Sequence, residues 1–311
     1  MEKMKAVRIH SYGGPDVLVY EDAPIPEPGT EEVRISVHAA GVNPLDWKVR
    51  EGSMKGIHTL PLILGWDVAG VVDTAGSGVT TIKPGDAVYG LLNMAGNGAY
   101  AKYTIAEAKS MAFKPKTADF VHAAAVPVSC LAAWQSLFDL AHLMAGQTVF
   151  IQGATGGVGH YAVQLAKWKG ARVIGTTSGD SIDFARELGV DEVIDYQKAR
   201  FEDKVCNVDV VLDLIGGETQ KRSWQVVKKG GVLVSTVGIS SPEEAAKHGV
   251  HGEALRVHPD AQDLTEIASL IDSGKLKPIV ADVFPLEEAR KAQETVRSGK
   301  VHGKVVLKVR D

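Results

Sequence analysis

A glycine-rich loop, "GATGGVG" at residues 153–159, follows the apolar run "TVFIQ" and precedes a helical pattern that reaches Lys167. A strand, a tight turn and a helix in this order form the context of a dinucleotide-binding fingerprint, which holds a pyrophosphate at the helix N-terminus. We expect Gly156 to let the backbone approach the pyrophosphate and Gly159 to let the helix pack on the strand. Ala154 stands at the first glycine position of the fingerprint, so the loop is a variant of it. The alternative is a tight turn without a ligand. The predicted cofactor residues of the loop are Ala154, Thr155, Gly156, Gly157, Val158 and Gly159.

The residues that end the next strands indicate which cofactor the loop would take. The second strand ends at Thr177 and Ser178, where an NAD site usually places an acidic residue for the ribose 2′-hydroxyl. Only Asp180 would repel a 2′-phosphate there. In the expected strand order 3-2-1-4-5-6, Tyr196 ends the neighbouring strand, so we predict that Ser178 and Tyr196 bind the 2′-phosphate of NADPH. The alternative is that the Tyr196 ring only packs against the sheet edge. Residues after the fourth and fifth strands are expected near the nicotinamide: Asp213, Val237 and Gly238.

Two patterns of apolar residues divide the chain. Residues 1–122 contain short alternating runs interrupted by glycine and proline, which predict a small irregular β-rich domain. From residue 123, apolar strands alternate with helical stretches, which predicts an α/β fold with a parallel doubly wound sheet. A sixth strand is expected near residues 253–257 and a helix over 260–273. The alternating segment 304–309 is expected to return to the first domain. The predicted domains are therefore 1–122 with 276–311, and 123–275.

Composition narrows the class of partner. The 311 residues include 34 basic and 38 acidic side chains, with a net charge of -4 spread without blocks. This balance favours a small-molecule substrate over nucleic acid or an anionic membrane surface. Two cysteines, Cys130 and Cys206, are too few for a disulfide framework or a four-cysteine zinc lobe. No apolar stretch has the length and composition of a signal peptide or a membrane span, so a cytoplasmic protein is expected.

Seven short motifs carry a resemblance to a known family over essentially the whole chain. They are "GVNPLDWKVREG" (41–52), "LGWDVAGVV" (64–72), "KPGDAVYG" (83–90), "GAYAKY" (98–103), "ATGGVG" (154–159), "ELGVDEVIDY" (187–196) and "GKVHGKVVL" (299–307). With them the chain resembles the medium-chain dehydrogenase/reductase superfamily, and within it the zinc-free branch of quinone oxidoreductases and enone reductases. The resemblance implies a Rossmann domain plus a GroES-like irregular β-barrel, usually as a homodimer. It also implies transfer of the NADPH hydride to a quinone, or to the β-carbon of an α,β-unsaturated carbonyl bound between the domains.

The resemblance also has implications for metal binding and for the catalytic residues. Zinc-dependent members carry their ligands where Asn43, Trp66 and Val128 stand here. These side chains cannot supply the imidazole, thiolate or carboxylate donors that zinc needs, so no metal is expected. In a metal-free site the Asn43 amide becomes the expected donor to the substrate carbonyl, unless it only braces the turn before Pro44. Asp46 is expected to orient that turn or the cofactor. The resemblance implies that four aromatic residues line the substrate pocket: Trp47, Trp66, Tyr100 (or Tyr103) and Trp134. The alternative for Trp47, Trp66 and the tyrosine is a structural role.

Some features depart from the family pattern or leave the function open. A lysine common after the second strand of NADPH-using members is replaced around Asp180, and Ala132 stands where a threonine is usual. Lys304 matches a family position near the cofactor, although it could equally cap a strand end. An enoyl-thioester reductase has the same fold but would need a basic patch for its acyl carrier. A non-catalytic regulatory or structural protein that binds NADP(H) is the third reading, because fold does not fix function.

Overall fold

The computed structural model describes residues 2–310, which form two compact units. The first unit comprises the chain up to Leu131, His258–Gly274 and the chain from Pro278. The second comprises Ala132–Val257 and Lys275–Lys277. Helix α8 (Ala261–Asp272) belongs to the first unit because it packs on strand β8 (Met111–Phe113) and the Tyr89 hydroxyl donates to the Leu264 carbonyl at 2.5 Å. The sequence analysis had assigned this helix to the second domain.

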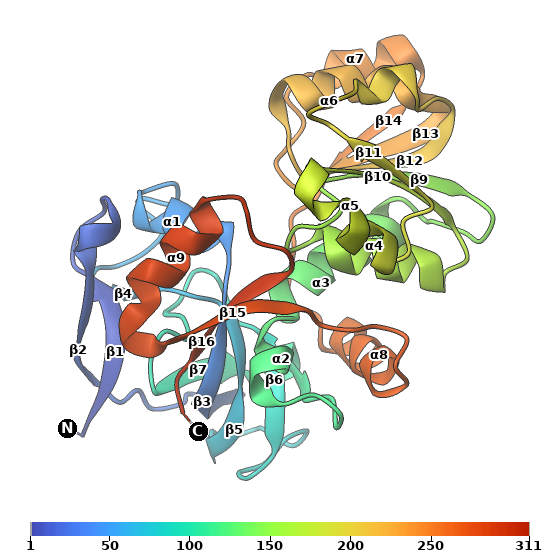
Figure 1. Cartoon of the computed structure of the whole chain (residues 1–311). Helices are drawn as coiled ribbons and strands as arrows, with labels where there is room; N and C mark the ends of the chain where they lie inside the picture. The colour runs from blue at the N-terminus through green and yellow to red at the C-terminus, as the bar shows by residue number, and fades with distance from the viewer. Residues whose placement is uncertain (1, 311) are drawn as a thin grey trace. The chain divides into compact units, whose positions relative to one another are not determined.

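A six-stranded parallel sheet forms the centre of the second unit. Its order is β11-β10-β9-β12-β13-β14, which confirms the predicted order 3-2-1-4-5-6. Helices α4 and α5 cover one face of the sheet, and α6 and α7 cover the other (Figure 1). Helices on both faces explain why the strand sequences are continuous apolar runs. The strands are β9 (Thr148–Gln152), β10 (Arg172–Thr177), β11 (Glu192–Asp195), β12 (Val208–Asp213), β13 (Val227–Ser235) and β14 (His251–Ala254). The helices are α4 (Gly159–Trp168), α5 (Ile182–Glu187), α6 (Gly217–Ser223) and α7 (Pro242–His248), and α3 (Pro127–Trp134) spans the boundary between the units.

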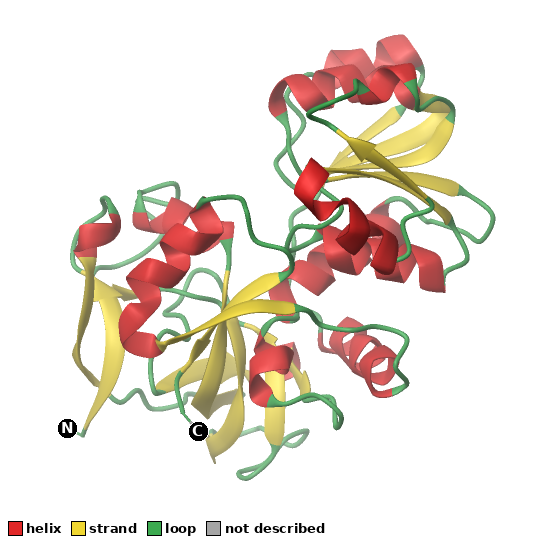
Figure 2. Ribbon diagram, viewed as in Figure 1, coloured by secondary structure: helices red, strands yellow, loops and turns green. Residues whose placement is uncertain are grey.

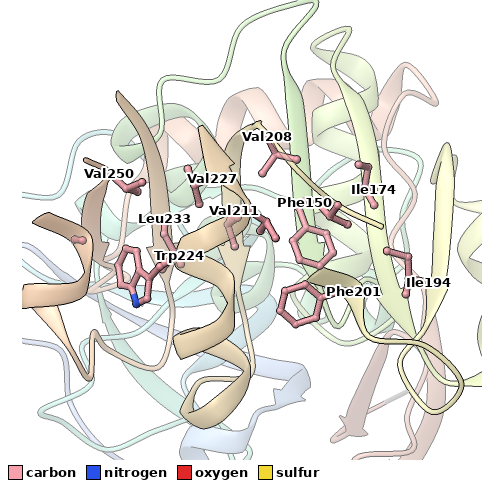
Figure 3. Close-up of a cluster of buried hydrophobic side chains, with 13 residues drawn as sticks. Phe150, Ile174, Ile194, Phe201, Val208, Val211, Trp224, Val227, Leu233 and Val250 are labelled. Atoms are coloured by element: carbon pink, nitrogen blue, oxygen red, sulfur yellow. The ribbon is translucent and has the colours of Figure 1, made fainter. Parts of the chain in front are cut away.

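A cluster of buried apolar side chains fixes this sheet (Figure 3). Phe150 of β9 lies with its ring centroid 5.2 Å from that of Phe201, and Trp224 is completely buried. Truncating such an aromatic side chain to alanine typically costs about 3–5 kcal/mol. The cluster therefore holds the strands, and the loops that follow them, in fixed positions.

The first unit is built mainly of antiparallel strands (Figure 2). One sheet has the order β15-β16-β3-β5-β6-β8 with β7 also paired to β3, and a smaller one has the order β2-β1-β4. Strand β16 pairs with β3, which confirms that the C-terminal segment returns to the first unit. The strands are β1 (Lys3–Ile9), β2 (Leu18–Pro24), β3 (Glu32–Val42), β4 (Leu62–Ile63), β5 (Asp67–Ala75), β6 (Ala87–Leu91), β7 (Tyr103–Glu107), β15 (Val280–Pro285) and β16 (Lys304–Lys308). The other helices are α1 (Pro44–Arg50), α2 (Phe120–Ala124) and α9 (Ala289–Arg297). Within residues 2–310, no helix has the length and apolar character needed to cross a membrane.

Candidate functional site

The glycine loop lies between the carboxyl end of β9 and helix α4. A Cβ atom added at Gly159 would lie 2.1 Å from the Gly153 carbonyl oxygen, so only glycine allows the helix to pack this closely. At Gly156 the nearest atom to an added Cβ is the same oxygen at 3.5 Å, which is an ordinary contact. The two positions therefore differ as the fingerprint requires: Gly159 serves packing, whereas Gly156 leaves one side of the backbone free of side-chain atoms.

Hydroxyl groups brace the loop against the end of β10. The Thr155 and Thr177 hydroxyl oxygens lie 2.9 Å apart, and the Ala154 N–H donates to the Thr176 carbonyl at 3.0 Å. Ser178 forms a similar hydroxyl pair with Ser181 at 3.0 Å. Thr155 and Thr177 therefore shape the loop through each other, and both are buried.

Tyr196 and a lysine that the sequence analysis missed follow strand β11. The Tyr196 side chain is 60% exposed, which argues against the alternative that its ring only packs on the sheet edge. Lys198 Nζ lies 3.5 Å from Asp195 Oδ2. The same ammonium lies close to Gly179, shortly after β10, because a Cβ atom added to that glycine would be 3.9 Å from Nζ. The parallel pairing of β10 with β11, which sets Thr177 opposite Asp195, brings this lysine there. A lysine three residues after the third strand was the signal that could have revealed it.

Asp213 has a structural role at the end of β12. Its buried carboxylate accepts hydrogen bonds from the Ile215 and Gly216 N–H groups at 3.0 and 2.8 Å, the Gln220 amide at 2.7 Å and the Ser235 hydroxyl at 2.8 Å. These four donors occupy both oxygens. Asp213 thus fixes the turn after β12, and its position near the nicotinamide stays a prediction.

Val237 and Gly238 follow β13 and are accessible. The Val237 side chain is exposed, and an added Cβ at Gly238 would meet no atom within 4 Å. The Gly238 carbonyl accepts a hydrogen bond from the Gln220 amide at 2.7 Å. Gln220 thereby links the ends of β12 and β13, where the sequence analysis expected the nicotinamide.

In the first unit, Asn43 and Asp46 meet at the start of α1. Asn43 precedes the helix, and its backbone N–H donates to Asp46 Oδ2 at 2.8 Å, as predicted for a side chain that orients this turn. The Tyr100 hydroxyl donates to the same oxygen at 2.7 Å. The ring of Tyr100 needs Gly65, because a Cβ there would lie 2.1 Å from a ring carbon. Burial raises the pKa of Asp46 to about 7, although these two hydrogen bonds act in the opposite direction. The other Asp46 oxygen, Oδ1, is buried without a hydrogen-bond partner.

Asp67, which the sequence analysis missed, lies beside Asn43. Its Oδ2 accepts from the Asn43 amide at 2.8 Å and its Oδ1 from the Val128 N–H at 2.6 Å. Gly41 leaves room for this carboxylate, since an added Cβ would lie 2.6 Å from Oδ2. Burial raises the pKa of Asp67, and the Lys304 ammonium opposes that shift. The only sign of this residue in the sequence was that an aspartate follows Trp66 in the "GWD" motif.

Lys304 also belongs to this cluster. Its ammonium donates to the Asn43 Oδ1 and, at 3.3 Å, to the Val42 carbonyl, and it lies 3.5 Å from Asp67 Oδ2. Burial lowers the pKa of Lys304, whereas the carboxylate of Asp67 raises it. Two of the three N–H donors of the ammonium thus bind Asn43 and Val42, and its charge faces Asp67. In this structure Lys304 therefore serves the first unit.

The aromatic residues predicted for the substrate pocket differ in their surroundings. Trp66 and Tyr100 are completely buried, so neither ring presents a surface to a ligand. The Trp66 indole N–H donates to the Gly96 carbonyl at 3.2 Å, and Tyr100 serves Asp46. Trp47 is partly buried, with the Arg297 guanidinium 5.1 Å from its ring centroid.

Trp134 belongs to the second unit, where it forms an aromatic cluster of its own. Its ring stacks on Trp168 with a centroid distance of 6.0 Å and meets Phe138 edge-on at 4.8 Å. Trp168 and Phe138 also meet edge-on, at 6.0 Å. Aromatic pairs at these separations contribute to packing, and this cluster explains the position of Trp134 without a ligand.

The residues at the former zinc positions do not fit a metal ion. Asn43 and Val128 both donate to Asp67, and the Lys304 ammonium already supplies a positive charge beside it. Among residues 2–310, no three His, Cys, Asp or Glu side chains are grouped closely enough to bind a metal. A dication would be repelled by the ammonium, and the two carboxylates of this cluster, Asp46 and Asp67, are fewer than the four ligands that zinc takes.

A cavity of about 570 Å³ lies elsewhere in the first unit. It is lined by β1, β2, β4, β7 and residues 93–98, and by none of the four buried residues Asn43, Asp46, Asp67 and Lys304. Gly96, which accepts the Trp66 indole N–H, forms part of its wall.

Two family models match the chain. The model described as "Alcohol dehydrogenase GroES-like domain" matches residues 29–116, and the one described as "Zinc-binding dehydrogenase" matches residues 188–307. The first range lies in the antiparallel unit. The second begins after α5 and ends in β16, so it spans parts of both units.

Relatives in sequence and structure cover nearly the whole chain. A 2-methylene-furan-3-one reductase of Solanum lycopersicum is 35% identical over 98% of this chain and 79% of its own length. An NADPH-dependent alkenal/one oxidoreductase of Arabidopsis thaliana, described as chloroplastic, is 35% identical over 98% and 80%. A quinone oxidoreductase of Rattus norvegicus is 30% identical over 98% and 97%. The solved structure of the quinone oxidoreductase from Coxiella burnetii superposes with a TM-score of 0.94, at 34% identity, over 99% of this chain and all of that one.

Proposed function

Because the chain belongs to the medium-chain dehydrogenase/reductase superfamily, within its branch of quinone oxidoreductases and enone reductases, we propose that it is an NADPH-dependent reductase of quinones and α,β-unsaturated carbonyl compounds. The observation that carries this proposal is the glycine loop, with an open Gly156 and a tightly packed Gly159. It occurs in a chain whose relatives over 98% of its length are named for reduction of enones or quinones.

The second unit offers groups suited to each part of NADPH. The loop 154–159 and the start of α4 would hold the pyrophosphate, because the first N–H groups of a helix have no partner within it. Ser178, Tyr196 and Lys198 would bind the 2′-phosphate. Val237 and Gly238 would border the nicotinamide. When bound, NADPH supplies the hydride for the reduction.

The first unit would stabilise the charge that develops on the substrate. Once the β-carbon of an enone has gained a hydride, negative charge resides on the carbonyl oxygen, and a donor aimed at that oxygen lowers the barrier. Among the described residues Asp67 is the one acceptor for the Asn43 amide nitrogen, which leaves its second N–H for the substrate. A proton from water then completes the saturated carbonyl at the α-carbon.

We propose that this reaction needs no metal. The pairing of Asn43 and Val128 with Asp67, and the ammonium of Lys304 beside them, support this. Elemental analysis of the purified protein should find no stoichiometric zinc, and a chelator should leave turnover unchanged. One zinc per chain would contradict the proposal.

Steady consumption of NADPH tests the activity itself. A panel of quinones and 2-alkenals should be reduced, with the products identified as hydroquinones and saturated aldehydes. Reduction of acyl-carrier thioesters alone would instead indicate an enoyl-thioester reductase. Tight NADPH binding without turnover of any substrate would indicate the non-catalytic reading.

The exposed edge of the parallel sheet indicates how the chain would assemble. All four residues of β14 are exposed at the edge of the parallel sheet, and an unprotected edge strand favours pairing with another chain. We therefore propose a homodimer in which two β14 strands pair, and light scattering should give twice the chain mass. Glu253→Pro, in the middle of β14, should then give monomers.

We also propose that the protein is cytoplasmic. Its two cysteines, Cys130 and Cys206, are free thiols, which suits a reducing cytoplasm.

A further inference from the structure

The buried neighbours of Asn43 have charges that fix how its amide is turned. We propose that Asp67 and Lys304 are positioning residues for enone reduction: together they hold the Asn43 amide in one orientation and strengthen its remaining N–H as a donor to the substrate carbonyl. This inference rests on the proposed function and goes beyond it. It also assigns to Lys304 a role that differs from the cofactor contact expected from the sequence.

The orientation of the amide follows from the chemistry of its two neighbours. A carboxylate only accepts hydrogen bonds, and an ammonium group only donates them. Asp67 must therefore face the amide nitrogen and Lys304 the amide oxygen, as in the structure. The flipped amide would set oxygen against carboxylate and NH₂ against ammonium. This would replace two favourable charged hydrogen bonds by two repulsive contacts.

Strand pairing keeps the three groups together. Strands β16, β3 and β5 are neighbours in one sheet, with Val305 opposite Val42 and Gly41 opposite Asp67. Lys304 and Asn43 are each adjacent in sequence to one of these paired residues. The register of two strand pairs therefore brings the ammonium, the amide and the carboxylate side by side.

Burial makes this arrangement effective. Asn43 and Lys304 are each 3% exposed and Asp67 is 0% exposed, so water does not screen their interactions. The ammonium on the amide oxygen draws electron density away from the nitrogen, which makes the N–H groups stronger donors. Asp67 takes one of them, and the other is left to meet the oxygen that becomes negative during hydride addition.

A double-mutant cycle tests whether Lys304 acts through Asn43. The variants are Lys304→Met, Asn43→Ala and the combination, with Lys308→Met, an exposed residue of the same strand, as the control. The readouts are kcat with an enone, kcat with a quinone, and the Kd of NADPH from fluorescence titration. We expect Lys304→Met to lower enone kcat about tenfold or more, as loss of a well-placed donor does. In the Asn43→Ala background it should add less than about twofold, because coupled residues are not additive. The Kd of NADPH should stay within about twofold of the parent, which is a shift of about 0.4 kcal/mol or less.

The opposite pattern would overturn the inference. If Lys304 bound the cofactor, its removal would raise the Kd of NADPH, and its effect on kcat would multiply with that of Asn43→Ala. Loss of one charge leaves the other buried and unpaired, so Lys304→Met could fail to fold. The charge-balanced pair Asp67→Asn with Lys304→Met avoids this. It should fold and still show the slow enone turnover, and parental turnover in this variant would equally overturn the inference.

A measurement without turnover separates this inference from the proposed function. The Asn43 side-chain NH₂ resonances, identified by their loss in Asn43→Ala, should exchange slowly with solvent in the parent protein and much faster in Lys304→Met. Unchanged exchange would reject the positioning role. A parent protein that reduces no enone or quinone would instead reject the proposed function, and with it the catalytic consequence of the positioning, whereas the exchange result would still report the orientation.

Discussion

The amide nitrogen of Asn43 lies 2.8 Å from Oδ2 of Asp67, and this hydrogen bond joins the start of helix α1 to the start of strand β5. One amide N–H of Asn43 therefore braces the fold, and the role proposed for Asn43 in catalysis would use the other. The two readings that the sequence left open, a donor to the substrate and a brace for the turn, are compatible because an amide NH₂ has two N–H groups. The effect of a mutation of Asn43 on turnover can consequently be interpreted only when the stability of the same variant is also measured.

The two loop glycines should fail in different ways when each is changed to alanine. Gly159→Ala introduces a methyl group 2.1 Å from a backbone oxygen. It should therefore lower the unfolding free energy of the second unit by about 3 kcal/mol or more, the upper end of the range for overpacked sites. Gly156→Ala meets ordinary contacts and should leave the melting temperature nearly unchanged. It should nevertheless weaken NADPH binding, because its methyl group occupies the side from which a pyrophosphate would approach. Thermal melts and fluorescence titrations of both variants check this, and full NADPH affinity in a well-folded Gly156→Ala protein would speak against the assignment.

Lys198 should determine much of the preference for NADPH over NADH. The 2′-phosphate is absent from NADH, so Lys198→Ala should raise the Kd of NADPH about tenfold, a loss of about 1.4 kcal/mol, and leave the Kd of NADH unchanged. Lys204→Ala, an exposed lysine further along the chain, is the matched control. An equal effect of Lys198→Ala on both cofactors would show that this lysine does not contact the 2′-phosphate, and that Asp180 and Asp195 dominate the local charge.

Features that follow from a local sequence pattern could be predicted, whereas contacts that depend on strand pairing could not. The order of the parallel strands and the glycine loop were predictable because each depends on a local pattern: apolar runs between helices, and glycines at fixed spacing. The position of Lys198 near Gly179 depends on the pairing of β10 with β11, so its place three residues after β11 reveals it only when combined with the strand order. The charged neighbours of Asn43 depend in the same way on strand register, between residues far apart in sequence.

The aromatic residues expected to line the substrate pocket show a different limit of sequence reasoning. A tryptophan or tyrosine in a family motif can line a pocket or fill a core, and its sequence is the same in both cases. Trp66 and Tyr100 are 0% exposed, and their polar atoms donate to Gly96 and Asp46. Asp213 is comparable, because its four hydrogen-bond donors come from a turn and from side chains that only the folded structure brings together.

Asp46 should make the stability of the protein depend on pH. Burial raises its pKa from 3.8 to about 7, so between these values the folded state holds a proton that the unfolded state has released. Stability should therefore fall as pH rises from about 4 to about 7 and level off above that range, since the slope follows the difference in bound protons. The groups that face Asp46 are the Asn43 N–H, the Tyr100 hydroxyl and the more distant charges of Asp67 and Lys304.

Asp46→Asn removes this titration and serves as the comparison. The difference in unfolding free energy, parent minus Asp46→Asn, should decrease as pH rises through this range in urea titrations at matched ionic strength. The raised pKa of Asp67 contributes a trend of the same sign to both proteins, so it cancels in the difference. A difference that stays constant, or that grows with pH, would show that Asp46 is ionised throughout.

The most direct test of the account is the turnover of an enone by Asn43→Ala at saturating NADPH, measured where circular dichroism shows the variant to be folded. Loss of the amide leaves Asp67 with one donor fewer, so a lower stability of about 1–3 kcal/mol is expected and has to be allowed for. Removing one donor to a developing oxyanion typically lowers kcat by about 10² to 10³. The account predicts a fall of this size for the enone and a smaller fall for a quinone, which accepts hydride readily without such help. Enone turnover at near the parental rate in the folded variant would contradict it, and would leave Asn43 as a structural residue.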